Sequence, residues 1–229
     1  MKSKYLYLTI NLLSFIVPFL FSFYPKASFF RKWKYVWPAI IASGAIFVLW
    51  DVSFTWLGVW GFNPNYVTGI FWLGLPIEEF LFFICIPYAC LFTYFALNHL
   101  IEHDYLRPHH ELITSALIIA LLIVGIYNIH RIYTTVAMLC TGLFLAFSLL
   151  KLRMRFMGRF YFAFGVLLIP FLIINGALTG SFTDEPIVWY NNAENLGIRL
   201  GTIPLEDVFY GMLMILVPIT VWEKLEHGY

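Results

Sequence analysis

Five acidic residues of this 229-residue chain lie inside long apolar stretches, with no basic residue close by in the sequence: Asp51, Glu78, Glu79, Glu206 and Asp207. An ionised acid at the centre of a membrane costs roughly 2.5–3.5 kcal/mol, so such residues are rarely incidental. Removal from water and a like-charged neighbour both favour the neutral carboxylic acid. Paired acids in such a place can therefore hold a proton and deliver it. The alternative is that they only cap helices near the membrane surface.

Four of these acids belong to a motif that occurs twice. The motif reads N-x5-G-x6-P-[IL]-E-[ED], and its two copies align without gaps at an offset of 128 residues, pairing Asn63 with Asn191, Gly69 with Gly197, and Pro76-Ile77-Glu78-Glu79 with Pro204-Leu205-Glu206-Asp207. Proline is favoured at the first position of a helix and acids in its first turn. Each copy is therefore predicted to open a helix, with structural roles for Pro76, Pro204, Gly69 and Gly197.

The composition shows what kind of helices these are. Hydrophobic residues make up 61% of the chain and charged residues 12%, about half the 25% that is usual in soluble domains. Stretches of about 20 apolar residues predict membrane spans, and seven qualify: Tyr5–Tyr24, Val36–Trp60, Leu75–Leu100, Leu112–Ile129, Ile132–Leu150, Phe160–Leu178 and Ile203–Trp222. The sequence thus predicts an all-α membrane protein with seven transmembrane helices.

The motif offset predicts how the spans are grouped. It equals four helices, so both copies run in the same direction across the membrane, as in the parallel repeats of transporters. We expect a first repeat at residues 1–100, a connector helix at 101–130 and a second repeat at 131–229. If the repeats pack around a common axis, Glu78 and Glu206 approach it from opposite sides.

Basic residues in the loops predict the orientation, because cytoplasmic loops are enriched in Lys and Arg. One side holds ten: Lys26, Arg31, Lys32, Lys34, Arg107, Lys151, Arg153, Arg155, Arg159 and Lys224. The other holds four: Lys2, Lys4, Arg131 and Arg199. We therefore expect the N-terminus outside the cell membrane and the C-terminus in the cytoplasm.

Aromatic and polar residues surround both motifs. Trp and Tyr belts at a membrane surface explain many of the rings, but ring faces can also stabilise a carbocation. The candidates for substrate binding or support are Asp51, Trp56, Trp60, Phe62, Asn63, Trp189, Tyr190, Asn191, Glu194, Asn195 and Tyr210.

In combination, the twin motifs and the flanking Trp60-Gly61-Phe62-Asn63 and Glu194-Asn195-Leu196-Gly197 resemble the membrane-integral lycopene cyclases, in the form that fuses two small bacterial subunits. The resemblance implies redox-neutral, proton-initiated closure of the ends of lycopene to β-ionone rings, giving γ-carotene and then β-carotene. It implies Glu78, Glu206, Glu79 and Asp207 as catalytic acids and bases. Neighbouring helix residues point about 100° apart, so we expect a pair across the axis, such as Glu78 with Asp207 or Glu206.

The resemblance also implies the molecules that the protein meets. Its partners would be lycopene, carotenoid intermediates and the lipid bilayer, and contacts with other carotenoid enzymes are compatible with it. No cofactor is expected, because a GxGxxG with a following acid is absent from the sequence. No metal site is expected from the scattered histidines, and the net charge of +1 gives no sign of nucleic-acid binding.

A second class of function fits the same acids. A proton-coupled carrier or a lipid-binding membrane protein would also place buried carboxyls in duplicated helices. The pigment separates the classes, since a cyclase converts lycopene and a carrier leaves it unchanged.

Overall fold

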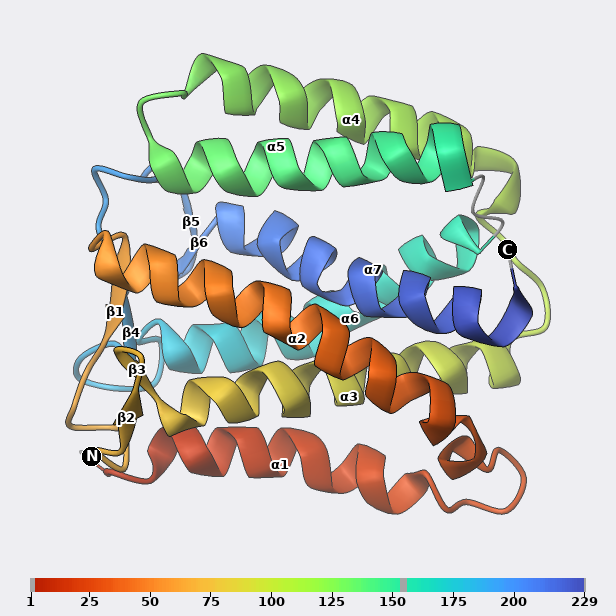
Figure 1. Cartoon of the computed structure of the whole chain (residues 1–229), viewed down its shortest axis with the longest axis horizontal. Helices are drawn as coiled ribbons and strands as arrows, with labels where there is room; N and C mark the ends of the chain where they lie inside the picture. Colours follow the sequence, from red (N-terminus) through yellow and green to blue (C-terminus); the bar gives the residue numbers. More distant parts are fainter. Residues whose placement is uncertain (1–2, 153–155, 229) are drawn as a thin grey trace.

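Seven helices that run alternately up and down make up most of the protein (Figure 1). The computed structural model describes residues 3–152 and 156–228. The helices are α1 (Leu6–Phe21), α2 (Trp33–Trp56), α3 (Ile77–Leu100), α4 (His110–Tyr127), α5 (Ile132–Phe147), α6 (Met157–Leu178) and α7 (Glu206–His227). Six are long and apolar enough to cross a membrane. The chain is an all-α, multi-pass membrane protein, as its composition predicts.

Each predicted span has a matching helix, and the bounds differ by up to five residues. The helix α1 has 16 residues and ends at Phe21 instead of Tyr24. Pro25 disfavours helical backbone at Tyr24, so the helix cannot continue through the predicted end. The helix α2 stops at Trp56, since Gly58 takes a left-handed conformation with φ +71° and the chain then forms a strand.

Short strands gather at one end of the helices, beside the N-terminus (Figure 1). They are β1 (Trp60–Phe62), β2 (Phe71–Trp72), β3 (Leu75–Pro76), β4 (Val188–Tyr190), β5 (Arg199–Leu200) and β6 (Ile203–Pro204). Every strand before α3 has a counterpart before α7 exactly one motif offset later in the sequence. The duplication therefore also holds for the backbone of the two segments that precede α3 and α7, residues 57–76 and 179–205, which we call the connectors.

The strands β1 and β4 pair across the two repeats and mark the axis that relates them. They run antiparallel, and the central pair joins Gly61 to its own counterpart, Trp189. The flanking backbone hydrogen bonds are also symmetric. The backbone N–H of Asn63 donates to the Ile187 carbonyl, and the backbone N–H of Asn191 donates to the Val59 carbonyl, both at 2.8 Å. A pseudo-two-fold axis therefore passes through the middle of this strand pair.

The two repeats interlock around this axis. In each repeat the first helix packs on the third, α1 on α3 and α5 on α7, while α2 packs against α7 and α6 against α3. The acids lie in the first turns of α3 and α7, as predicted, with Pro76 and Pro204 in the strands just before. The motif thus places acids of both repeats at the same end of one helix bundle.

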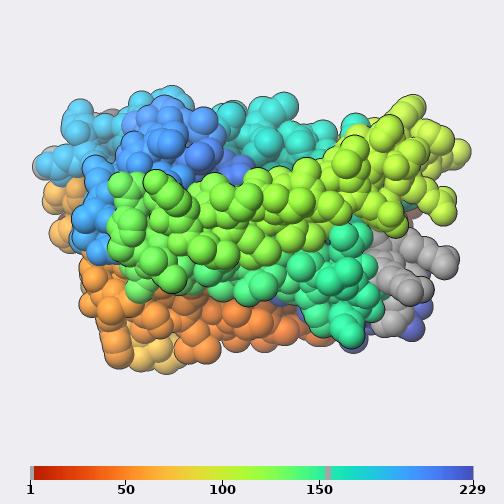
Figure 2. Space-filling model, turned by 90° about the horizontal axis from the view of Figure 1, so that it is seen from above, coloured from red at the N-terminus to blue at the C-terminus, as the bar shows by residue number. Residues whose placement is uncertain are grey.

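The helix α4, which joins the two repeats in the sequence, lies on the outside of the bundle. It packs along α5, and the two helices run side by side across the face shown in Figure 2. It buries Thr114, Leu121 and Gly125, while its remaining residues are partly or fully exposed. We therefore propose that residues 1–100 and 131–229 form the two repeats and that residues 101–130, which contain α4, link them.

Candidate active site

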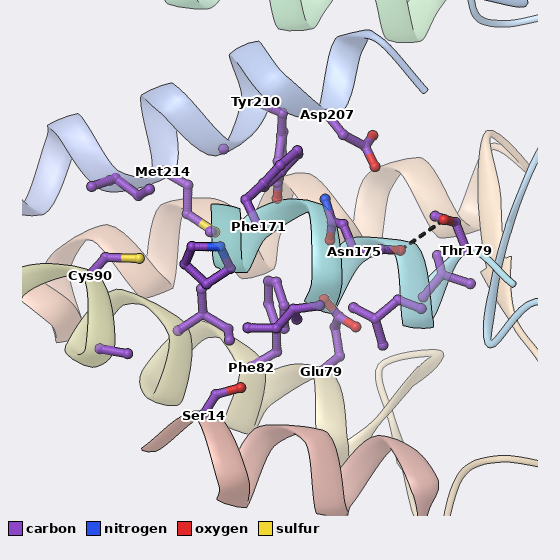
Figure 3. Close-up of a pocket in the computed structure, with 18 of the residues that line it drawn as sticks. Ser14, Glu79, Phe82, Cys90, Phe171, Asn175, Thr179, Asp207, Tyr210 and Met214 are labelled. Atoms are coloured by element: carbon purple, nitrogen blue, oxygen red, sulfur yellow. Dashed lines mark hydrogen bonds between the residues drawn. The ribbon is translucent and has the colours of Figure 1, made fainter. Parts of the chain in front are cut away.

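A cavity of about 270 Å³ lies at the centre of the bundle and contains acids from both repeats. Glu79 of α3, Asp207 of α7 and Asp51 of α2 line it. Figure 3 shows Glu79 and Asp207 on opposite sides of the cavity, with Asn175 between them, Tyr210 on the side of Asp207 and Phe82 on the side of Glu79. The described residues include no group of three or more His, Cys, Asp and Glu placed to hold a metal ion.

Glu79 is held by a tyrosine from the first helix. The Tyr7 hydroxyl donates to Glu79 Oε2 at 2.5 Å, and both side chains are buried. Tyr7 is itself fixed by its backbone N–H, which donates to the Tyr66 carbonyl at 3.2 Å. The connector before α3 therefore sets the position of the tyrosine that orients the acid.

Asp207 is held by two tyrosines. The hydroxyls of Tyr133 and Tyr190 donate to its two carboxyl oxygens, Tyr190 at 3.0 Å. Burial and the neighbouring Asp207 raise the pKa of Tyr190, in strand β4, well above its usual range. Its hydroxyl thus keeps its proton and remains a donor. The backbone N–H of Tyr133 donates to the Glu194 carbonyl, just as that of Tyr7 donates to the equivalent Tyr66 carbonyl.

Asp51 adds a third acid without a counterpart in the second repeat, where Thr179 stands at the equivalent position. The Trp60 indole N–H donates to Asp51 Oδ1. The other oxygen, Oδ2, is buried and has no hydrogen-bond partner among the described residues. The carboxyls of Asp51 and Glu79 are close enough to interact electrostatically. Asp51 therefore brings an uncommitted carboxyl oxygen to the cavity.

Aromatic rings form much of the cavity wall near the acids. The ring centroid of Trp60 lies 6.0 Å from that of Tyr190 and 6.1 Å from that of Tyr210. Phe62, Phe82 and Phe171 line the cavity as well. Ring faces carry partial negative charge, so this wall can stabilise a cation next to the carboxyls.

Glu78 and Glu206 lie outside the cavity lining, and each accepts a backbone N–H from an equivalent position of its repeat. Glu78 Oε1 accepts the backbone N–H of Thr68 and Glu206 Oε1 that of Leu196, both at 2.7 Å. Each side chain is completely buried. They tie the connectors to the helices, about 100° around the helix from the acids that face the cavity. The motif acids that line the cavity are thus Glu79 and Asp207, and the structure does not bring the expected pair of Glu78 with Asp207 or Glu206 together there.

The predicted supporting residues divide into two groups. Asp51, Trp60, Phe62, Tyr190 and Tyr210 line the cavity. The structure places Trp56 at the end of α2 and the others in the segments before α3 and α7.

The connector residues have contacts of their own. The side-chain oxygens of Asn63, Asn191 and Asn195 accept N–H groups two residues further along the chain. Glu194 Oε2 accepts the N–H of Ile132 at the start of α5. The exposed Trp56 packs beside Gly74, and Trp189 covers Gly61. Gly69 and Gly197 take left-handed backbone with φ +91° and +72°. These residues build the turns that carry the acids.

Sequence reasoning missed two of the three tyrosines that hold the acids, Tyr7 and Tyr133. Tyr7 and Tyr133 occupy equivalent places at the start of α1 and α5 but stand 126 residues apart, two fewer than the motif offset. A gapless alignment therefore does not pair them. Asn175 of α6 and Thr179 directly after it were also missed, because nothing in the motifs marks that helix.

Comparison with known proteins identifies a family for this chain. The family model described as lycopene cyclase matches residues 4–97 and 130–225. The two blocks contain α1 to α3 and α5 to α7, and they leave out α4. No match is found among curated proteins or among solved structures. Since the matched blocks cover most of its length, this chain belongs to the lycopene cyclase family, whose members are membrane enzymes of carotenoid cyclisation.

Proposed function

We propose that the protein is a lycopene β-cyclase, which closes each acyclic end of lycopene to a β-ionone ring without net oxidation or reduction. One observation carries this proposal. Carboxyls of both repeats, Asp51 and Glu79 from the first and Asp207 from the second, line a single aromatic-walled cavity.

The reaction needs one acid and one base at each ring end. A carboxylic acid gives its proton to C2 of the terminal double bond, which leaves a tertiary cation at C1. The 5,6 double bond attacks C1, so that the C1–C6 bond forms and the positive charge moves to C5. A base then removes the proton from C6 and the ring double bond forms. The product is an isomer of the substrate.

The contacts of the three acids suggest their roles. Asp51 and Glu79 line the same cavity, and burial beside a second carboxyl favours the neutral acid for one of them. We assign the donated proton to this pair. Asp207 accepts hydrogen bonds on both oxygens, which matches an ionised carboxylate, because that form only accepts. We assign the C6 proton to Asp207.

The remaining features of the cavity fit the substrate and the intermediate. Trp60, Tyr190 and Tyr210 offer ring faces to the cation, and the apolar helices exclude the water that would trap it. Ligand pockets of drug-sized molecules span about 300–1,000 Å³. A cavity of about 270 Å³ therefore suits one end of a carotenoid rather than the whole molecule.

Expression in a lycopene-accumulating bacterium tests the proposal. We expect a change from lycopene to carotenoids with β-rings, resolved by chromatography, and no change with an Asp207→Asn variant produced at the same level. Unchanged lycopene with the correctly inserted wild-type protein would contradict the proposal and would favour the carrier or lipid-binding alternative.

A further inference from the structure

The cavity departs from the two-fold symmetry of the helices around it. The helix α1 contributes Ser14 and Pro18, and α6 contributes a long stretch that includes Asn175. Their symmetry counterparts are α5 and α2. Among the described lining residues, these two helices supply Tyr133 and Asp51 alone. The cavity therefore extends from the axis toward the α1 and α6 side.

Phenylalanines fill the symmetry-related space on the other side. Phe83 stands 128 residues before Gly211, and Phe47 stands 128 residues before Asn175. Both phenylalanines are at most 2% exposed and belong to a buried cluster with Leu213 and Met214. Their ring centroids are 6.3 Å apart. Where the second repeat has glycine and asparagine at the cavity, the first repeat has a packed core.

Gly211 has no backbone reason to be glycine. It lies inside α7, where glycine is a poor helix former, and its φ is not in the left-handed region. A Cβ at this position would lie 3.4 Å from the Phe171 ring, an ordinary contact that leaves the backbone free to carry a side chain. The absence of a side chain is explained by the space that it leaves in the cavity.

The polar groups of the cavity are also unequal between the repeats. Asp51 corresponds to Thr179, and Trp60, which donates to Asp51, corresponds to Val188. Tyr190, which donates to Asp207, corresponds to Phe62. Each repeat thus supplies groups that the other lacks, so neither carries a complete set by itself.

We propose that the protein has one reaction chamber for both ends of lycopene, kept open by Gly211 and Asn175, and that the two ends react there in turn. This inference rests on the proposed function. The monocyclic product must withdraw after the first closure, because the chamber fits one carotenoid end. It then returns with its acyclic end. Gly211 and Asn175 are positioning residues that determine which side of the axis accepts substrate.

Partial filling of the chamber tests the proposal. Gly211→Leu and Asn175→Leu should each lower kcat/KM, measured per amount of folded protein, by at least tenfold. The factor should be the same for lycopene and for the monocyclic carotenoid. The matched control is Phe83→Leu at the counterpart of Gly211, which should change neither value more than twofold. A larger share of monocyclic product than the wild type shows at the same lycopene conversion, or bicyclic product at half the wild-type rate or more, would overturn the single chamber.

Isotope dilution with the wild-type protein gives an answer even if the variants fail to fold. Labelled lycopene is converted in membranes that also contain unlabelled monocyclic carotenoid. One chamber predicts that the label in the bicyclic product is diluted by the unlabelled pool, because the intermediate leaves between closures. Undiluted bicyclic product would overturn the proposal. A wild-type protein that leaves lycopene unchanged would instead refute the proposed function itself.

Discussion

At the scale of single residues, the two acids of each motif differ in what they contact. Glu79 and Asp207 face the cavity and are held by tyrosine hydroxyls. Glu78 and Glu206 accept backbone N–H groups of the connectors. The first acid of each motif therefore fixes the turn, and we propose that the second takes part in the chemistry.

Amide substitutions at the cavity acids test this division. Glu79→Gln and Asp207→Asn keep the shape of the side chain but remove the titratable proton. We expect each to lower the cyclisation rate by about 10²–10⁴-fold, the usual contribution of general acid–base catalysis. The rate is measured by chromatography of carotenoids at equal amounts of inserted protein. Wild-type rates in either variant would remove that residue from the catalytic set.

The matched substitution at Glu78 should behave differently. Glu78→Gln retains an oxygen that can accept the Thr68 N–H, so we expect most of the activity to remain. Glu78→Leu leaves this N–H without a partner and should lower the free energy of unfolding by about 1–3 kcal/mol. Thermal unfolding in detergent, with activity per folded protein, measures both. A folded but inactive Glu78→Gln would return a catalytic role to this residue.

At the scale of elements, the cross-repeat strand pair holds the two halves in register. A Cβ at Gly61 in β1 would lie 2.4 Å from Trp189 Cζ2, too close for any real contact. We expect Gly61→Ala to push β1 and β4 apart and to cost about 1–3 kcal/mol in stability, as overpacking does. The measurement is thermal unfolding.

A second glycine serves as the control for this substitution. Gly165 in α6 has open space around the position of its Cβ. Gly165→Ala should be neutral or slightly stabilising, because alanine is the better helix former. Equal effects of the two substitutions would contradict the close packing of β1 against Trp189.

The sequence predicts the helices well and the strands poorly, for physical reasons. Apolar stretches of about 20 residues mark the membrane helices whatever their neighbours are. The pairing of Trp60 with Tyr190 depends on the assembled repeats, so no local pattern in the sequence encodes it. The same holds for the bond from Tyr7 to Glu79, which joins residues 72 positions apart.

At the scale of the whole molecule, α4 links two repeats that each have three helices. We expect residues 1–105 and 106–229, expressed together as separate chains, to assemble and cyclise lycopene, since the cut falls between α3 and α4. Either fragment expressed by itself should leave lycopene unchanged, because the cavity takes residues from both repeats. Co-purified fragments without activity would show that the covalent link is required.

The orientation in the membrane is a second prediction at this scale. The loops α1–α2 and α3–α4 and the facing ends of α5 and α6 lie at the same end as the C-terminus, and the strands lie at the other end (Figure 1). Three of the basic residues behind the prediction, Lys2, Arg153 and Arg155, are outside the described residues. We expect a reporter fused to the C-terminus to read cytoplasmic and one at the N-terminus to read external. The reverse pattern would contradict the orientation.

Cyclisation in heavy water tests most directly the claim that carboxyls in the cavity start the reaction by proton transfer. Carboxyl protons exchange with solvent between turnovers, so the acid delivers a deuteron to C2. We predict one solvent deuteron per ring, at C2, with none added elsewhere, located by NMR and mass spectrometry of the product. Rings without deuterium, or with deuterium at another carbon, would contradict proton-initiated closure at the terminal double bond.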